Sequence, residues 1–130
     1  MTWPQVYVML PGTAREALEF YRGVFGGDLE IHDYGEFGRT DGPANAVAHG
    51  VLTGRVGLMI ADAGPGDDAV ATTGLMLSVL GEEPDLLRGW FGALTEGGRV
   101  LDDLQQRPWG DWDGQVRDRF GLTWLVGFRG

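Results

Sequence analysis

The sequence predicts an α+β fold made of two tandem β-α-β-β-β modules within one domain of 130 residues. Two observations indicate this repeat. An alternating, strand-like segment followed by a helix-like segment occurs twice along the chain. The glycine pairs that end the two expected helices, Gly26-Gly27 and Gly97-Gly98, begin 71 residues apart (97 − 26). We place module 1 at about residues 4–62 and module 2 at about residues 73–130.

The first module opens with residues 5–10, which alternate between two faces. Val6, Val8 and Leu10 share one face, and the other face carries Gln5, Tyr7 and Met9. The following helix is expected to begin after Thr13, because Thr13 and Glu16 have the spacing of a capping box. Apolar residues at spacings of three and four extend it to about Phe25.

Three further strands complete module 1, at about residues 29–34, 47–52 and 56–61, with glycine and aspartate at the junctions. Residues 62–73 show neither a helical nor a strand period and are predicted to be a linker. Module 2 repeats the order, with a strand at 74–79 and a helix from Pro84 to the second glycine pair. Its remaining strands are expected at 99–104, 114–118 and 122–128.

Each module should form a curled, four-stranded antiparallel sheet that its helix covers on one face. The uncovered face of each sheet would then be free to line a cup for a ligand. The alternative is that two small α+β halves share one core and leave no cavity.

The charge pattern excludes several kinds of function. Nineteen acidic residues face ten basic ones, a net charge of −9, and every basic residue is arginine. The absence of cysteine and lysine excludes disulfides, thiolate chemistry and Schiff-base lysines, and no basic patch for nucleic acid is present. No apolar run is long enough for a membrane span, and no basic segment precedes an apolar one near the start. We expect a cytoplasmic protein that binds neither nucleic acid nor membrane.

Several strings carry a family resemblance: Gly12-Thr-Ala-Arg-Glu-Ala-Leu-Glu-Phe-Tyr21, Val24-Phe-Gly-Gly-Asp-Leu29, Tyr34-Gly-Glu-Phe-Gly38, Trp109-Gly-Asp111 and Asp118-Arg-Phe-Gly-Leu-Thr-Trp124. With the repeat, they resemble the vicinal-oxygen-chelate superfamily of glyoxalases, bleomycin-resistance proteins and extradiol dioxygenases, in particular its PhnB-like branch. The resemblance covers nearly the whole chain. It implies paired modules assembled as a homodimer whose cups hold the ligand.

The resemblance also implies where a divalent metal would lie in an enzyme of this superfamily. The ligands there are His, Gln or Glu on the first and last strands of each module. The corresponding residues here are Gln5, Met59, Gly74 and Leu125, and only Gln5 offers an oxygen ligand. Divalent sites need about three or more converging nitrogen or oxygen ligands. We therefore expect no metal and no cofactor.

The expected cup wall is apolar and rich in methionine, with aromatic residues in two glycine-flanked loops at its rim. His49 shares a face with Val47 and should look into the cup as a hydrogen-bonding or acid–base group. A solvated network of charged side chains is expected at the rim, formed by Asp111, Asp113, Arg117, Asp118 and Arg119. Arg117 would meet a ligand oxygen if it faces the cavity. His32 is expected to be a solvated edge residue. The predicted ligand-binding residues are Tyr7, Met9, Tyr34, Phe37, Val47, His49, Met59, Met76, Trp109, Trp112, Arg117 and Leu125.

These features predict metal-independent binding and sequestration of a small apolar or aromatic natural product, as in resistance to an antibiotic. One alternative is an enzyme, a lyase, isomerase or dioxygenase, with unrecognised metal ligands or with His49 as its acid or base. Another is a structural or regulatory module that uses its sheet edges to contact proteins.

Overall fold

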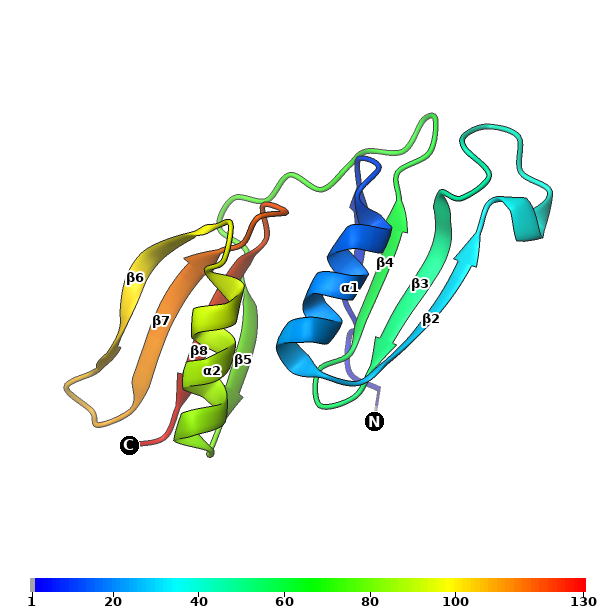
Figure 1. Ribbon diagram of the computed structural model, residues 1–130. Helices are drawn as coiled ribbons and strands as arrows, with labels where there is room; N and C mark the ends of the chain where they lie inside the picture. The colour runs from blue at the N-terminus through cyan, green and yellow to red at the C-terminus, as the bar shows by residue number, and fades with distance from the viewer. Residues whose placement is uncertain (1) are drawn as a thin grey trace. The chain divides into compact units, whose positions relative to one another are not determined.

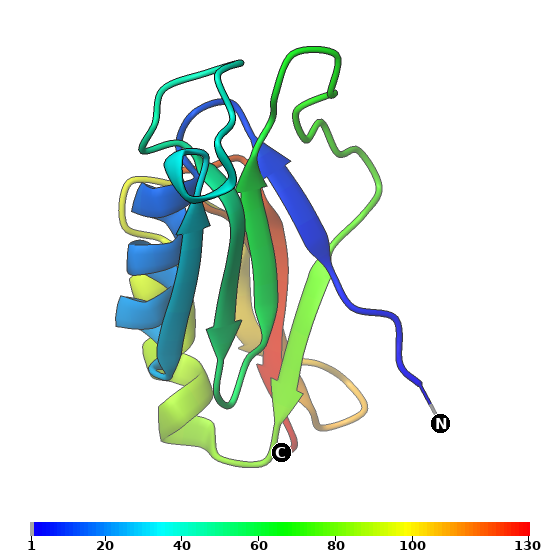
Figure 2. The ribbon, with the colours of Figure 1, turned by 90° about the vertical axis from the view of Figure 1, so that its right-hand side faces the viewer.

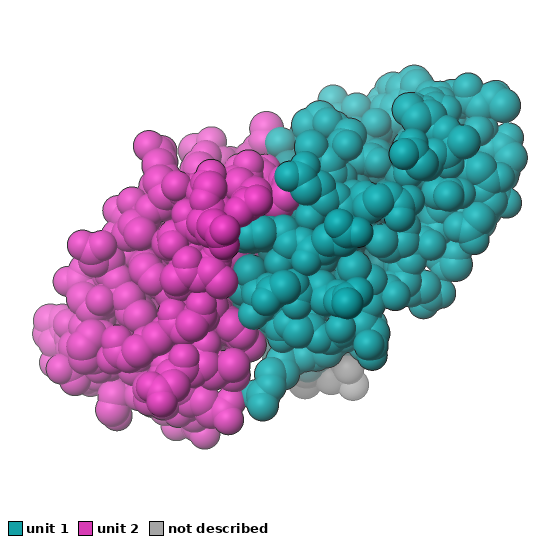
Figure 3. Space-filling view, viewed as in Figure 1, with its two compact units in different colours: residues 1–70 teal, residues 71–130 magenta. Residues whose placement is uncertain are grey.

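The computed structural model describes residues 2–130, which form two compact units that divide between Val70 and Ala71 (Figure 3). Each unit has one four-stranded sheet and one helix packed on it (Figure 1). The predicted α+β fold with a repeated β-α-β-β-β order is confirmed.

Unit 1 contains β1 (Tyr7–Leu10), α1 (Ala14–Phe25), β2 (Asp28–Asp33), a short 3₁₀ helix η1 (Gly35–Phe37), β3 (Val47–Thr53) and β4 (Leu58–Asp62). Its strands lie in the order β1-β4-β3-β2. In Figure 2, α1 lies on one side of this sheet. The core between helix and sheet contains Leu18, Tyr21, Val8, Leu52 and Ile60, all buried.

Unit 2 contains β5 (Leu77–Gly81), α2 (Pro84–Leu94), β6 (Arg99–Gln106), β7 (Trp112–Arg117) and β8 (Thr123–Phe128), with strand order β5-β8-β7-β6. Helix α2 packs on β8, β5 and β7. Its core contains Leu87, Leu94, Val116, Trp124 and Val126. No helix within residues 2–130 has the length and apolar character needed to cross a membrane.

Both sheets are mixed, so the expectation of purely antiparallel sheets was wrong. β1 runs parallel to β4, and β5 runs parallel to β8, while the other neighbours are antiparallel. The reason is the crossover helix, which returns the chain to the end where β1 began, so that β2 runs in the direction of β1. Two antiparallel steps then give β4 that same direction.

The start of α1 is held differently from the predicted capping box. Neither Thr13 nor Glu16 makes a side-chain capping bond. Instead, the Ala14 N–H donates to Oδ1 of Asp62 at 2.9 Å, and the Val47 N–H donates to Oδ2 of the same carboxylate at 2.8 Å. One side chain at the end of β4 therefore fixes both the helix and the start of β3. The end of α1 follows the prediction, since Gly26 has a φ of 75° and its N–H donates to the Arg22 carbonyl.

The turn between β7 and β8 contains a buried carboxylate, so the prediction that Asp118 belongs to a solvated rim was wrong. Asp118 is only 3% exposed. Its Oδ1 accepts from the N–H groups of Phe120 and Leu122, at 2.8 and 3.1 Å, and its Oδ2 accepts from Nε1 of Trp124 at 2.8 Å. Buried carboxylates are tolerated only when their oxygens are hydrogen-bonded in this way. These three hydrogen bonds to Asp118 fix the turn that sets the β7–β8 register.

Candidate functional site

Each sheet has one face away from its helix, which we call the open face of that unit. In unit 1, the partly exposed residues Tyr7, Met9 and Met59 alternate with buried residues that contact the helix side. A Cβ at Gly50 would lie 2.3 Å from Leu18 of α1, so the next residues along β3, His49 and Val51, point to the open face. The open face of unit 1 thus brings together four predicted ligand-binding residues: Tyr7, Met9, His49 and Met59.

Tyr7 and His49 form a direct pair on this face. The Tyr7 hydroxyl lies 3.0 Å from Nδ1 of His49, and the two rings stack with centroids 5.5 Å apart. Burial raises the pKa of the Tyr7 phenol above its usual value, so that phenol stays protonated near neutral pH. When the Tyr7 hydroxyl donates to Nδ1, neutral His49 carries its proton on Nε2. The Nε2–H of His49 is then the hydrogen-bond donor that the pair offers to a bound molecule.

His32 also points to the open face, where it pairs with His49 across the two strands. Its Nε2 lies 2.9 Å from the Glu30 carboxylate and its Nδ1 lies 3.2 Å from Glu36. The Glu36 carboxylate also accepts from the Asp33 N–H, so this cluster links β2 to η1. His32 is thus part of an ion-pair cluster, whereas we expected a solvated edge residue without a partner.

We predict that His32 titrates above its ordinary value. The hydrogen bond that the His32 ring donates to the Glu30 carboxylate, and then the one that it donates to Glu36, raise the pKa of His32 in the folded protein. A raised folded-state pKa means that the cluster stabilises the fold fully below the unfolded pKa of about 6.5. This stabilisation is lost as pH rises through the folded pKa. Proton NMR of the His32 ring should show the titration above that of a denatured control, and a midpoint at or below the control would contradict the assignment.

The open face of unit 2 borders a cavity of about 520 Å³, which we call the unit 2 cavity. Gly114 shows which face is open, because a Cβ there would lie 2.7 Å from Phe91 of α2. Asp113 and Leu125, which alternate with helix-facing residues, therefore point away from the helix. Trp109 is 70% exposed and Leu80 is 63% exposed, and both line the cavity. The other lining residues are Gly81, Glu82, Asp111, Trp112, Phe128 and Arg129.

Acidic side chains set the electrostatic character of this cavity. Asp113 is neutralised by Arg107, which also pairs with Asp102 at 2.6 Å. Glu82 lies 3.5 Å from Arg129. Asp111 has no cationic partner among residues 2–130. The cavity thus combines an apolar surface with an excess of negative charge.

Two predicted ligand-binding residues are placed differently from the expectation. Val47 is fully buried rather than on the open face. The register shifts between His32/His49 and Asp33/Val47, and this bulge turns Val47 toward the helix side. Trp112 was expected in a rim loop, but it is the first residue of β7. The Trp112 ring stacks on the Phe128 ring, with centroids 5.8 Å apart. The guanidinium of Arg88 from α2 lies 4.7 Å from the Trp112 ring, so only part of Trp112 is left to line the cavity.

The remaining predicted residues are dispersed. Tyr34 is buried beneath Arg39, whose Cζ lies 3.7 Å from the ring centroid. Phe37 is exposed on η1, with its ring 6.1 Å from that of His32. Met76 is exposed and precedes β5. Arg117 lies at the other end of β7 from the cavity, and its buried Nε has no hydrogen-bond partner in the part of the chain that the structure describes.

Sequence reasoning missed Leu80 and the Arg107 bridge. The predicted strand 74–79 stopped one residue before Leu80, whereas β5 runs from Leu77 to Gly81. Extending the alternation from Ser78 would have found Leu80 on the open face. The Arg107 bridge had no signal in the sequence, because irregular pairing of β6 with β7 brings Asp102 and Asp113 to one guanidinium.

The donor set does not fit the divalent metal that the superfamily resemblance implies. In unit 1, Met59 pairs with Tyr7, and in unit 2, Leu125 pairs with Ser78. Tyr7 and Ser78 are therefore equivalent positions of the two units. Gln5 lies two residues before Tyr7, and Met76 lies two residues before Ser78. The counterpart of Gln5 in unit 2 is thus Met76 and not Gly74. Met59 and Met76 offer only a thioether and Leu125 offers no ligand atom, where carboxylate or imidazole would be needed. Within residues 2–130, no three His, Cys, Asp or Glu side chains gather closely enough to hold a metal ion.

Comparisons with known proteins agree with this architecture. The family model of the glyoxalase/bleomycin resistance protein/dioxygenase superfamily matches residues 5–126. Protein YjdN of Escherichia coli K12 is 24% identical over 134 residues, covering 92% of this chain and 90% of that protein.

Two solved structures are similar over nearly their whole length. Protein PA1353 from Pseudomonas aeruginosa has a TM-score of 0.83 and 28% identity, covering 99% of this chain and 98% of that one. A PhnB protein from Bacillus cereus has a TM-score of 0.80 and 24% identity, covering 98% and 99%. The chain belongs to the glyoxalase/bleomycin resistance protein/dioxygenase superfamily.

Proposed function

We propose that this protein binds and sequesters a small, flat aromatic molecule without the help of a metal ion. The observation that supports this most is the unit 2 cavity, which the exposed side chains of Trp109 and Leu80 line together with Leu125. An indole offers a large flat surface and loses little side-chain entropy on binding. Trp109, Leu80 and Leu125 line the same cavity, and apolar residues gathered in this way mark a surface for a ligand.

The charge of the cavity refines the proposed ligand. Within the described residues 2–130, Asp111 has no cationic partner and Glu82 shares one solvent-exposed pair with Arg129. The protein as a whole carries a net charge of −9. A planar cation is therefore attracted to the protein and a neutral planar molecule is tolerated, whereas an anion is repelled at long range. A cationic planar natural product of antibiotic type matches both the shape and the charge.

The test is calorimetric titration with proflavine, a planar three-ring cation, beside the uncharged three-ring acridone. We expect Trp109→Ala to weaken proflavine binding about tenfold, because stacking on an aromatic ring contributes about 1 kcal/mol beyond its area. The matched control is Trp3→Ala, since Trp3 is 74% exposed but lies in unit 1. Equal losses in the two variants, or no binding of either compound to the native protein, would contradict the proposal.

The Tyr7–His49 pair favours a second candidate function, acid–base catalysis on the open face of unit 1. The 3.0 Å contact holds the imidazole and the phenol in the relation needed to pass a proton to a substrate oxygen or carbon. Such an enzyme would be a metal-free isomerase or lyase. The test measures turnover of a panel of superfamily substrates by the native protein and by His49→Ala. Turnover by the native protein that is lost in His49→Ala, with proflavine binding unchanged, would establish this function in place of sequestration.

We also propose a homodimer in the cytoplasm, as the superfamily resemblance implies. Each unit exposes an open face, and in a dimer such faces could be completed by a second copy of the chain. Sedimentation equilibrium should give twice the chain mass of 14.1 kDa. A monomer at micromolar concentration would contradict this part of the proposal.

A further inference from the structure

Two arginines lie directly opposite one another in the sheet of unit 2. Arg99 begins β6 and Arg117 ends β7, and the strand register pairs the two residues. Residues opposite one another in an antiparallel pair share a face, with their Cβ atoms about 4.5–5.5 Å apart. Because Gly114 and Val116 of β7 face the helix side, Arg117 and with it Arg99 belong to the open face. In Figure 1 they lie at the end of the sheet away from the β6–β7 loop, residues 107–111.

Neither of these arginines has a partner within residues 2–130. The side chains of Arg99 and Arg117 make no hydrogen bond and no ion pair there. Arg99 is exposed, whereas Nε of Arg117 is buried and lacks an acceptor. A buried N–H group without an acceptor is unfavourable, and like charges directly opposite in a sheet destabilise it. The fold therefore gains nothing from this pair.

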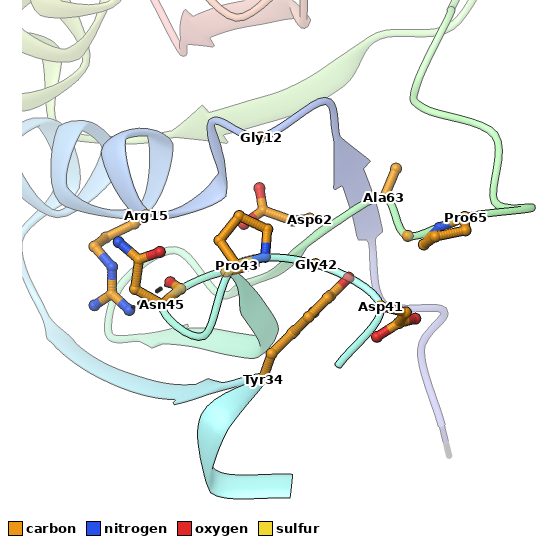
Figure 4. A pocket seen from close by; sticks show the side chains of 12 residues that line it. Gly12, Arg15, Tyr34, Asp41, Gly42, Pro43, Asn45, Asp62, Ala63 and Pro65 are labelled. Carbon is orange, nitrogen blue, oxygen red and sulfur yellow. Dashed lines mark hydrogen bonds between the residues drawn. The ribbon is translucent and has the colours of Figure 1, made fainter. Parts of the chain in front are cut away.

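The other arginines show that partners are available in the chain. In unit 1, Arg15 lines a cavity of about 280 Å³, and its Nη2 donates to the Asn45 carbonyl at 3.1 Å, the dashed contact in Figure 4. The sequence has nineteen acidic residues, so acids are not scarce. Four arginines each lie within 4.0 Å of a carboxylate: Arg39, Arg107, Arg119 and Arg129.

The carboxylates nearest to the pair along these strands are engaged elsewhere. Asp102 lies opposite Gln115, the next position of β7 on the open face, and is held by Arg107 at 2.6 Å. Asp118 is buried and accepts from three donors of its own turn. On the other side of Arg117, its partner on β8 is Thr123, whose hydroxyl can donate but carries no charge. The open face thus has two uncompensated positive charges at this end.

We propose that Arg99 and Arg117 together bind a tetrahedral dianionic oxyanion such as a phosphate group. Two guanidinium groups match its two charges and form short, charge-assisted hydrogen bonds to its oxygens. Side-on contact through Nε and one terminal nitrogen of Arg117 supplies the acceptor that the described chain does not. The exposed Arg99 side chain closes on the same ion from the neighbouring strand.

This site is independent of the aromatic ligand proposed for the unit 2 cavity. Arg117 is four residues (117 − 113) beyond Asp113 on β7, about 13 Å at the rise of an extended strand. The net charge of −9 repels an anion at a distance, but solution ions screen this field beyond about 8 Å, and within that range the two guanidinium groups dominate.

The experiment titrates inorganic phosphate into isotope-labelled native protein at pH 8 and constant ionic strength, and follows backbone amides and arginine Nε–H groups by NMR. We expect shifts at the Arg117 Nε–H and at the amides of Arg99 and Thr123. Methanesulfonate, a tetrahedral monoanion, should bind at least tenfold more weakly because it carries one charge. Phenyl phosphate as a third probe distinguishes an organic phosphate, which would bind more tightly, from the free ion, which would bind equally well.

Two variants and a control assign the roles. Arg99→Gln and Arg117→Gln should each weaken phosphate binding at least tenfold. Arg22→Gln removes the same charge from an exposed residue of α1 in unit 1 and should bind phosphate like the native protein. Without phosphate, Arg99→Gln should unfold at a higher urea concentration than the native protein, because the like-charged pair is gone.

Three results would overturn the inference. One is an Arg117 Nε–H resonance that phosphate leaves unmoved. The second is methanesulfonate binding as tightly as phosphate. The third is equal phosphate affinity of Arg99→Gln and Arg22→Gln, which is informative even if Arg117→Gln fails to fold, because Arg99 is exposed.

Discussion

Replacement of Asp118 by alanine is expected to lower the free energy of unfolding by about 3–5 kcal/mol, the larger of the two stability effects that we predict. The substitution leaves the N–H groups of Phe120 and Leu122 and the indole of Trp124 without their acceptor. Each buried donor that loses its acceptor costs about 1–3 kcal/mol. Such a loss is a large part of the stability of a small domain.

Urea denaturation followed by tryptophan fluorescence measures this effect, because four of the five tryptophans, all except Trp3, belong to unit 2. Asp118→Asn should be less damaging, since one amide oxygen still accepts. The matched control is Asp103→Ala, an exposed acid on β6, which should change stability by no more than about 0.5 kcal/mol. If Asp118→Ala and Asp103→Ala unfold at the same urea concentration, the carboxylate does not hold the turn.

The second large effect is expected for Asp62→Ala in unit 1, at about 2–3 kcal/mol. This carboxylate accepts from the first amide of α1 and from the first amide of β3. Loss of a helix-capping acceptor alone costs about 1 kcal/mol, and the second amide adds a similar amount. Urea denaturation followed by far-UV circular dichroism gives the value.

Thr13→Ala is the informative companion to that variant. If the capping box of the sequence pattern operated, Thr13→Ala would cost about 1 kcal/mol. Since the Thr13 side chain makes no capping bond, we expect almost no change. A larger loss for Thr13→Ala than for Asp62→Ala would show that the helix is capped from its own sequence after all.

Local sequence patterns predicted the features of the fold that depend on neighbouring residues. The three-and-four spacing of apolar residues predicted α1, and Gly26 marked its end through its positive φ. These signals succeed because a helix and its glycine cap are defined within a few residues of chain. The same holds for the repeat, which two glycine pairs revealed.

The errors occurred where a distant segment decides the structure. Asp62 replaces the local cap of Thr13 across 48 residues of chain. The bulge in β3 turns Val47 to the helix side, and alternation alone cannot detect an inserted residue. Asp118 is a different case, since its three donors lie only two to six residues later, and a charged residue in a turn gives no signal that an indole covers it.

The sequence predicted a surface with aromatic and apolar side chains on the open sheet faces, but only some of the residues that form it. Trp109 and Leu125 do line one cavity, and Tyr7 and His49 do share one face. The sequence could not show that Trp112 would be held between Arg88 and Phe128. It also predicted an apolar wall, whereas Asp111 and Glu82, which lies outside the predicted strand 74–79, give the unit 2 cavity an excess of negative charge.

The central claim is that a planar aromatic molecule binds the unit 2 cavity without a metal ion. Proflavine titrated into chelator-treated, isotope-labelled protein, followed by NMR, tests it most directly. We predict shifts at the Leu80 and Leu125 amides and at the Trp109 indole, with the same dissociation constant after addition of Zn²⁺ or Ni²⁺. Binding that begins only when the divalent ion is added, or shifts that leave these three residues unchanged, would contradict the claim.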